Sequence, residues 1–138
     1  MTISFSIILP NYNSPYLERA VSSVIKQTYN KWELIIIDNF SSNSPDKLIN
    51  KFKDERIKFY KFDNKNNIAR ARNYGIEKSN YHWIAFLDAD DVWKKNKLKK
   101  QIYYMEKMKA DFSHTDYNII NDEDKVIGKM KVKKKMSY

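Results

Sequence analysis

The chain has 138 residues, of which 42% are hydrophobic and 14% aromatic, so it can bury one core and is not of disordered composition. It has no cysteine, which excludes disulfides and thiolate metal sites and leaves carboxylates or histidine as metal ligands. No apolar run approaches the roughly 20 residues of a membrane span, and the N-terminus lacks the basic start and cleavage site of a signal peptide. We therefore expect a single cytoplasmic domain.

The net charge of +9 is concentrated towards the C-terminus. Residues 94–138 have 13 basic and 6 acidic side chains, whereas residues 1–93 have 13 basic and 11 acidic ones. A basic surface of this kind can bind anionic lipid or nucleic acid. A solvated lysine face is the more common explanation of such a charge run.

Short apolar runs alternate with amphipathic stretches along the chain. Strands are predicted at residues 5–9, 32–38, 57–62, 82–87 and 112–117, with a helix after each of the first four. Ser14 is expected to cap the first helix, with Pro15 at its first position, and Asn67 to cap the third, which runs to Ser79. The second helix is expected to start at residues 44–46.

The long fourth helix is predicted to end near Lys109, and its inner face is marked by Leu98, Ile102, Met105 and Met108. Residues 121–124 then predict a hairpin turn. Four alternations of strand and helix predict an α/β fold with a mostly parallel, doubly wound sheet. Binding sites in such folds gather at the carboxyl ends of the strands.

Three carboxylates, Asp88, Asp90 and Asp91, directly follow an apolar run at residues 84–87 that is predicted to be a buried strand. Like charges this close repel one another unless a cation neutralises them, and oxygen ligands suit Mg²⁺ or Mn²⁺. A diphosphate is the natural cargo of such an ion. The alternative is a solvated turn in which Asp91 caps the following helix.

Polar residues also follow the first two strands. Tyr12 can stack on a base, although a packed loop residue is the alternative. Asp38 and Asn39 can bind a base N–H or a ribose hydroxyl, or they can form an Asx turn. In the third helix, Ile68, Ala71, Gly75 and Ile76 are expected to face the sheet, with Gly75 permitting close contact. One arginine of this helix can hold a phosphate or pair with Asp88.

Five ordered segments together resemble the inverting family-two glycosyltransferases of the GT-A fold, over roughly residues 4–120: residues 6–13, 22–29, 33–39, 71–76 and 84–93. The resemblance implies a Rossmann-like, mostly parallel sheet flanked by helices. It also implies one nucleotide-sugar-binding domain over residues 1–138, with a core at 1–117 and a hairpin and basic tail at 118–138.

The resemblance implies specific roles for residues at the strand ends. Asp88-Ala89-Asp90 matches the Asp-x-Asp signature, so Asp90 and Asp88 would bind Mn²⁺ or Mg²⁺. The resemblance assigns the nucleotide sugar to seven residues, namely Pro10, Tyr12, Asn13, Asp38, Asn39, Arg72 and Asp88. Many relatives have an acid where this chain has Asn39, which weakens the expectation of a uracil-specific contact.

The function implied is metal-dependent transfer, with inversion, of a sugar from a nucleotide diphosphate sugar to an acceptor hydroxyl. The expected donor is a UDP-sugar and the expected acceptor a glycan or lipid-linked sugar in surface polysaccharide synthesis. The basic C-terminal segment would contact the inner face of the membrane.

Relatives continue beyond this length to supply the acceptor site and catalytic base, so we expect a donor-binding fragment or a natural truncation and assign no base. The late carboxylates, Asp116 and those of residues 122–124, are poor candidates. A catalytically silent nucleotide-sugar-binding module is the alternative. A basic nucleic-acid-binding domain is a more distant one, and no nucleic-acid partner is expected.

Overall fold

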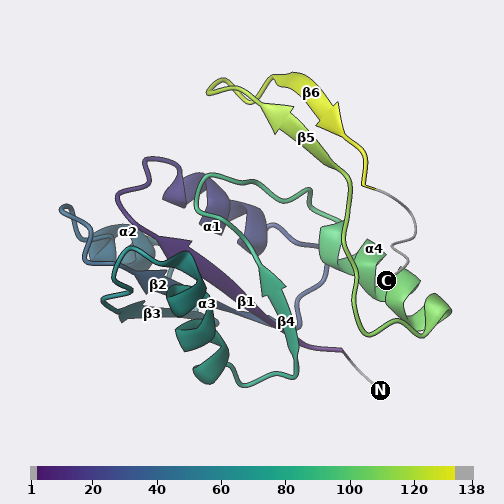
Figure 1. Cartoon of the computed structure of the whole chain (residues 1–138), viewed down its shortest axis with the longest axis horizontal. Coiled ribbons are helices and arrows are strands. Elements are labelled where there is room, and N and C mark those ends of the chain that lie inside the picture. The colour runs from purple at the N-terminus through teal and green to yellow at the C-terminus, as the bar shows by residue number, and fades with distance from the viewer. Residues whose placement is uncertain (1–2, 133–138) are drawn as a thin grey trace. The chain divides into compact units, whose positions relative to one another are not determined.

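The computed structural model describes residues 3–132, and its contacts divide the chain into two compact units, Met1–Lys100 and Gln101–Tyr138. The first unit contains a four-stranded sheet in the order β3-β2-β1-β4, with every neighbouring pair parallel. Its elements along the chain are β1 (Phe5–Asn11), α1 (Leu17–Ile25), β2 (Trp32–Asp38), α2 (Asp46–Lys51), β3 (Ile57–Lys61), α3 (Ile68–Glu77) and β4 (Trp83–Phe86) (Figure 1).

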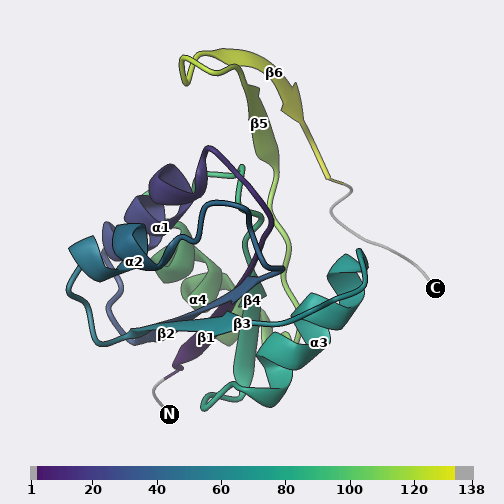
Figure 2. The same cartoon turned by 90° about the vertical axis from the view of Figure 1, so that its left-hand side faces the viewer.

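The two central strands, β1 and β2, are buried along their whole length. Figure 2 shows why, since α1 and α2 lie on one side of the sheet and α3 on the other. A strand covered on both faces needs apolar residues without alternation, which the continuous apolar run of β2 supplies. Four strands and three helices of the predicted α/β pattern are therefore confirmed, and β3 lies at an edge as its alternating sequence indicates.

Helix α3 packs against the middle of the sheet through its small residues. A Cβ added to Gly75 would lie 2.5 Å from Cγ2 of Ile8, so the close contact expected at this glycine is present. Asn67 caps the helix as predicted, its side chain accepting a hydrogen bond of 2.9 Å from the backbone N–H of Ala69. The expectation that Ile68 and Ile76 face the sheet is wrong, because both are exposed and only the narrower stripe of Ala71 and Gly75 is buried.

Helix α1 starts later than predicted, and Ser14 does not cap it. The helix begins at Leu17, and the hydroxyl of Ser14 instead donates to the backbone oxygen of Ala89 at 3.1 Å. The same hydroxyl accepts from the backbone N–H of Tyr16 at 3.2 Å. The long-range bond to Ala89 occupies the hydroxyl that the local sequence pattern assigns to helix capping. It also links the loop after β1 to the acidic loop after β4.

The boundary between the units falls within α4 (Lys97–Met108), and the second unit continues into an antiparallel hairpin of β5 (Tyr117–Ile120) and β6 (Val126–Met130). The predicted turn is confirmed, since the side chain of Asn121 accepts hydrogen bonds from two backbone N–H groups within it. The strand predicted at residues 112–117 is wrong. Only Tyr117 of that range belongs to a strand, because Val126–Met130 pairs with the residues that follow it.

Within the described residues, no helix has both the length and the apolar composition needed to cross a membrane.

On α4, Leu98 and Met105 are buried as predicted, whereas Met108 is 70% exposed, contrary to the expectation that it faces inwards. The lysines at 133–135, which dominate the basic tail, lie outside the described residues.

Candidate donor site

The loops that follow β1, β2 and β4 all leave the same edge of the sheet. The register places Asn11 opposite Asp38 at the ends of β1 and β2, and the backbone N–H of Leu87 after β4 donates to Ile8 of β1 at 3.1 Å. The polar residues picked out in the sequence are therefore gathered at one edge, as a parallel sheet requires.

Asp38 is the buried anchor of this edge. Its carboxylate accepts hydrogen bonds from the side chain of Asn11 at 2.7 Å and from the hydroxyl of Ser41 at 2.6 Å. The backbone N–H of Ser41 adds a third bond of 3.0 Å, which closes the local turn that the sequence offered as an alternative. Asp38 is fully buried, so its carboxylate fixes the shape of two loops.

The loops held by Asp38 expose two aromatic rings. Asn13 links them, donating its backbone N–H to the Ser41 hydroxyl at 2.8 Å and accepting from the backbone N–H of Ser42 at 2.8 Å. Tyr12 is 60% exposed and Phe40 is 61% exposed, whereas Pro10 is buried at the end of β1. Both Asn13 and Phe40 have left-handed backbone, with φ of 50° and 53°. Phe40 has no sequence signal of its own, because its exposure depends on this turn.

Asn39 connects the edge to the loop between β3 and α3. Its side-chain oxygen accepts from the backbone N–H of Asn64 at 3.1 Å, so the amide is committed to a loop contact. Asn64 is itself buried, and its side-chain oxygen has no hydrogen-bond partner within the described part of the chain. The side-chain oxygen of Asn11 is in the same state. Buried acceptors without donors cost free energy, so this edge offers two places for a ligand N–H or O–H.

In the sequence, only the asparagines at 64, 66 and 67 indicate that the loop between β3 and α3 contributes to this edge. The sequence analysis assigns no role to Asn11 or Asn64. Lys65 and Asn66 add two consecutive left-handed residues there, with φ of 52° and 56°. Backbone held in sparsely populated conformations clusters at binding sites.

The acidic loop after β4 contains one paired carboxylate and two open ones. Arg72 of α3 binds Asp88 with a 2.8 Å contact between Nη2 and Oδ1, and its guanidinium lies 5.3 Å from the ring centroid of Phe86. Of the two options for an arginine of this helix, pairing with Asp88 is the one observed. The Nε atom of Arg72 is buried and has no acceptor within residues 3–132. Phe86 is 47% exposed, so the end of β4 is less buried than predicted.

The side chains of Asp90 and Asp91 both reach solvent, although the surroundings of Asp91 partly desolvate it, and neither forms an ion pair or hydrogen bond within residues 3–132. Partial burial, and then the negative charges of Asp90 and Asp88, raise the pKa of Asp91 above its ordinary value. The alternative role of Asp91 as a helix cap is wrong, because α4 begins only at Lys97.

No group of three potential metal ligands is assembled within the described part of the chain. A cation at this loop would therefore need oxygen atoms from outside the protein, such as phosphates and water, which is how Mg²⁺ is commonly bound. The carboxylates of this loop repel one another, and they suit an ion that the protein binds through only some of its ligands.

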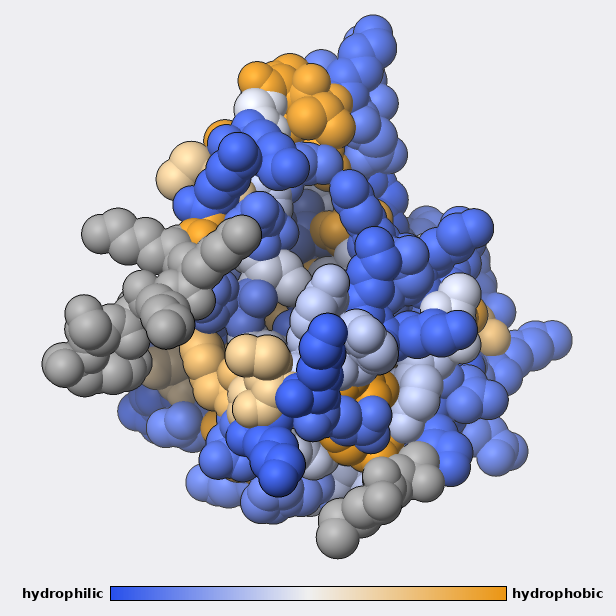
Figure 3. Space-filling model, turned by 90° about the vertical axis from the view of Figure 1, so that its right-hand side faces the viewer, coloured by the Kyte–Doolittle hydropathy of each residue, from blue (hydrophilic) through white to orange (hydrophobic). Residues whose placement is uncertain are grey.

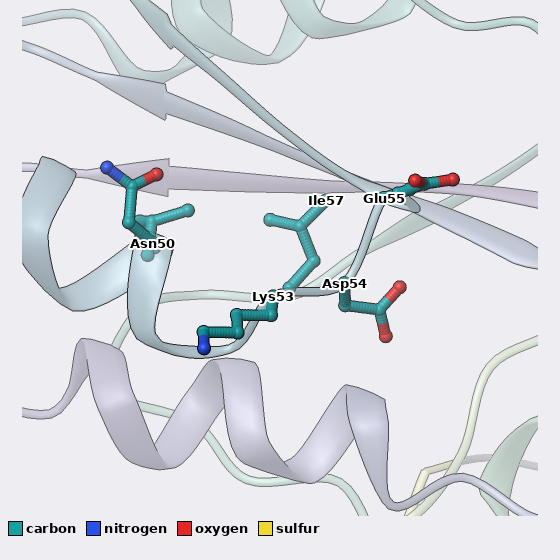
Figure 4. A pocket seen from close by; sticks show the side chains of 6 residues that line it. Asn50, Lys53, Asp54, Glu55 and Ile57 are labelled. Carbon is teal, nitrogen blue, oxygen red and sulfur yellow. The ribbon is translucent and has the colours of Figure 1, made fainter.

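A different pocket lies at the opposite edge of the sheet, between α2 and the start of β3. It is lined by Ile49, Asn50, Lys53, Asp54, Glu55 and Ile57 (Figure 4). Asp54 there is paired with Arg56 at 2.6 Å. The amino ends of parallel strands are not where open α/β sheets bind ligands, and none of the residues assigned from the sequence lies in this pocket.

Comparison with known proteins identifies relatives of the whole described fold. Residues 6–137 match the sequence model of the family Glycosyl transferase family 2. The chain is 39% identical over 134 residues to UDP-Glc:alpha-D-GlcNAc-diphosphoundecaprenol beta-1,3-glucosyltransferase WfgD of Escherichia coli. That alignment covers 96% of this chain and 53% of WfgD, so the chain spans about half the length of this relative.

Two solved structures share the fold. TarS of S. aureus (residues 1–349), in complex with UDP-GlcNAc, has a TM-score of 0.73 at 24% identity, covering 79% of this chain and 33% of TarS. The mannosyltransferase PcManGT of Pyrobaculum calidifontis, in complex with GDP-Man and Mn²⁺, has a TM-score of 0.68 at 18% identity, covering 87% of this chain and 36% of that protein. These likenesses confirm the predicted α/β architecture.

Proposed function

The chain belongs to glycosyl transferase family 2, and we propose that it forms the donor-binding part of an inverting glycosyltransferase that uses a UDP-sugar. The observation that carries the proposal is the sheet edge itself. It combines a loop pair anchored by buried Asp38 with an acidic loop in which Asp90 has no protein partner among the described residues. Such an edge can bind both parts of a nucleoside diphosphate, the base at the polar and aromatic loops and the diphosphate through a cation at the acidic loop.

The base and ribose would bind at the loops after β1 and β2. The exposed ring of Tyr12 offers a stacking face, and Pro10 and Asn13 support the loop that carries it. Asp38 and Asn39 hold the neighbouring loop in place through Ser41 and Asn64. In this proposal the buried oxygen atoms of Asn11 and Asn64 accept hydrogen bonds from the ligand. Recognition of the ligand through Asn11 and Asn64 does not require an acid at position 39 in addition to Asp38.

The diphosphate would bind at the acidic loop. Asp90, with Asp88, would hold a Mn²⁺ or Mg²⁺ ion, which when bound neutralises charge on the departing nucleoside diphosphate. Arg72 neutralises Asp88 in the protein alone, and its planar guanidinium can bind a phosphate while keeping the same place beside Phe86.

Two related proteins support the choice of donor and acceptor. WfgD is named as a transferase from UDP-Glc to a diphosphoundecaprenol-linked sugar, and TarS has been solved with UDP-GlcNAc. We therefore propose a UDP-sugar donor and a lipid-linked acceptor in polysaccharide synthesis, with the protein working at the inner face of the membrane. The acceptor hydroxyl would displace UDP with inversion, and no base for its proton is assigned to this chain.

Calorimetric titration of UDP into this chain, with and without Mn²⁺, tests the proposal. We expect Mn²⁺-dependent binding of UDP that is lost in Asp90→Asn, because the amide keeps the shape of the side chain but not its charge. The matched control is Glu55→Gln, which neutralises an exposed carboxylate at the opposite edge of the sheet and should bind UDP like the unaltered protein. Binding of UDP by Asp90→Asn with unchanged Mn²⁺ dependence would remove Asp90 from the site. Absence of UDP binding by the unaltered chain would reject the proposal.

A further inference from the structure

Helix α4 has an apolar inner face and an unusual outer one. Leu98 and Met105 are buried, whereas Tyr103, Tyr104 and Met108 are 57%, 59% and 70% exposed. The exposed residues on the side of the helix opposite Leu98 and Met105 form what we call the outer face. They are Lys99, Lys100, Tyr103, Tyr104, Lys107 and Met108. Figure 3 shows one face of the molecule, on which pale and tan side chains are interspersed among blue, hydrophilic ones.

The two tyrosines of the outer face pack on each other. Their ring centroids are 5.3 Å apart with an interplanar angle of 75°, and Nζ of Lys107 lies 5.8 Å from the ring centroid of Tyr103. The rings therefore form a small aromatic surface beside a lysine. Phe112, shortly after the helix, is 76% exposed. Three aromatic rings and one methionine are thus exposed on this helix and just after it.

The charge of this region is predominantly positive. Residues 97–109 contain five lysines, one acid, Glu106, and no arginine. Lysines with apolar stems and tyrosines with polar tips are the side chains found at the boundary between lipid and water. Recognition of single phosphates in a fixed geometry, as in nucleic acid, instead favours arginine. The combination matches an anionic lipid surface in both charge and polarity.

We propose that the outer face of α4 binds the surface of an anionic lipid bilayer. Tyr103 and Tyr104 lie at the level of the headgroups, Met108 inserts beside them, and Lys100 and Lys107 approach the lipid phosphates. This assigns the membrane contact to a helix face rather than to the basic C-terminal segment in which the sequence placed it. The assignment does not depend on donor binding, although it suits an enzyme with a lipid-linked acceptor.

Co-sedimentation with vesicles tests the assignment. The chain is mixed with vesicles of phosphatidylcholine alone or of equal parts phosphatidylcholine and phosphatidylglycerol, and we expect binding to the anionic vesicles that weakens at high salt. The double variant Lys100→Gln/Lys107→Gln should bind about 25-fold more weakly, since each lysine near an anionic surface contributes about fivefold. Lys47→Gln/Lys51→Gln, which removes the same charge from exposed positions on α2, is the matched control and should change binding less than about twofold.

A second measurement does not depend on loss of affinity. The chain has no cysteine, so Tyr104→Cys and, as control, Lys47→Cys can each be labelled with an environment-sensitive fluorophore. Anionic vesicles should shift the emission to the blue at position 104 and leave it unchanged at position 47. Equal weakening by the two lysine pairs, or no shift at position 104, would overturn the proposal. A shift at position 104 with a single-stranded oligonucleotide but not with vesicles would also overturn it, in favour of nucleic acid.

Discussion

The two edges of the same parallel sheet differ in the polar groups that surround their buried carboxylates. At the amino edge, Glu33 of β2 accepts four hydrogen bonds, from the Ser6 hydroxyl at 2.5 Å, Nζ of Lys58 at 2.6 Å, and the backbone and side-chain N–H groups of Asn80 at 2.7 Å and 2.9 Å. At the carboxyl edge, Asp38 is also satisfied, but the oxygen atoms of Asn11 and Asn64 beside it are buried without partners in the described chain.

The contrast is between one closed polar cluster, around Glu33, and an edge with several open polar groups, although the buried Trp32 Nε1 at the amino edge also has no partner among the described residues. The Glu33 cluster joins β1, β2, β3 and the segment before β4, and each of its groups has a partner, so it needs nothing from outside. The carboxyl edge keeps open acceptors, repelling carboxylates and four left-handed residues, namely Asn13, Phe40, Lys65 and Asn66. A ligand or an ordered water that offers N–H or O–H groups would complete it.

The largest expected effect comes from breaking the amino edge. Glu33→Ala leaves Lys58, Ser6 and Asn80 without their shared acceptor, and we expect a loss of about 2–4 kcal/mol in the free energy of unfolding, the lower part of this range reflecting the one-third exposure of Lys58. Urea unfolding measures it, and Glu55→Gln serves as the neutral control. A loss below about 0.5 kcal/mol would mean that the cluster is not structural.

The carboxylate of Glu33 should also make the free energy of unfolding depend on pH. Burial works against ionisation, but hydrogen bonds from Lys58, Ser6 and Asn80 outweigh it and hold the pKa of Glu33 below its ordinary value of 4.5. The stability from this lowered pKa is therefore present above pH 4.5 and is lost as pH falls through the folded-state pKa. The stability difference between Glu33→Ala and the unaltered protein should narrow over that acidic range.

A smaller effect on stability, but a clear one on binding, is expected at the carboxyl edge. Arg72→Lys keeps the charge beside Asp88 but loses the planar fork, so UDP affinity in the presence of Mn²⁺ should fall about tenfold. Because both partners are at least one-third exposed, the free energy of unfolding should change by less than about 1 kcal/mol. Arg70→Lys, an exposed position on the same helix, is the matched control. Equal UDP affinities for both variants would show that Arg72 does not act in the site.

The smallest expected effect is at Asp91. Partial burial and the charges of Asp90 and Asp88 raise its pKa above 3.8, so the folded state binds its proton more tightly than the unfolded state does. Stability therefore falls as pH rises from 3.8 through the folded-state pKa, and Asp91→Asn should raise Tm slightly at neutral pH. Asp63→Asn is the opposite case, because hydrogen bonds from Lys65 lower the pKa of Asp63, and it should not raise Tm. Scanning calorimetry of both variants decides the sign.

Features governed by local patterns were predicted from the sequence. The strands at the centre of the sheet follow from their apolar runs, the Asn67 cap from its position before α3, and the close approach at Gly75 from a glycine on a packed helix face. The position of the acidic loop at the carboxyl edge follows from the end of the apolar run at Leu87.

Features governed by distant contacts were not predicted. The hydroxyl of Ser14 binds Ala89, which lies 75 residues away in sequence, and so it does not cap α1. Asn64 enters the candidate site only because Asn39, 25 residues earlier, holds its backbone. Neither contact leaves a periodic signal, because each depends on the register of the sheet.

The ligand site that we propose is the carboxyl edge of the sheet and not the pocket at its amino edge. The most direct test is to record amide chemical shifts of the chain by NMR while UDP and Mg²⁺ are added, Mg²⁺ being used because it is diamagnetic. We predict that the shifts concentrate at residues 11–13, 38–41, 64–66 and 88–91. Shifts confined to residues 49–57, around the pocket of Figure 4, would contradict the account.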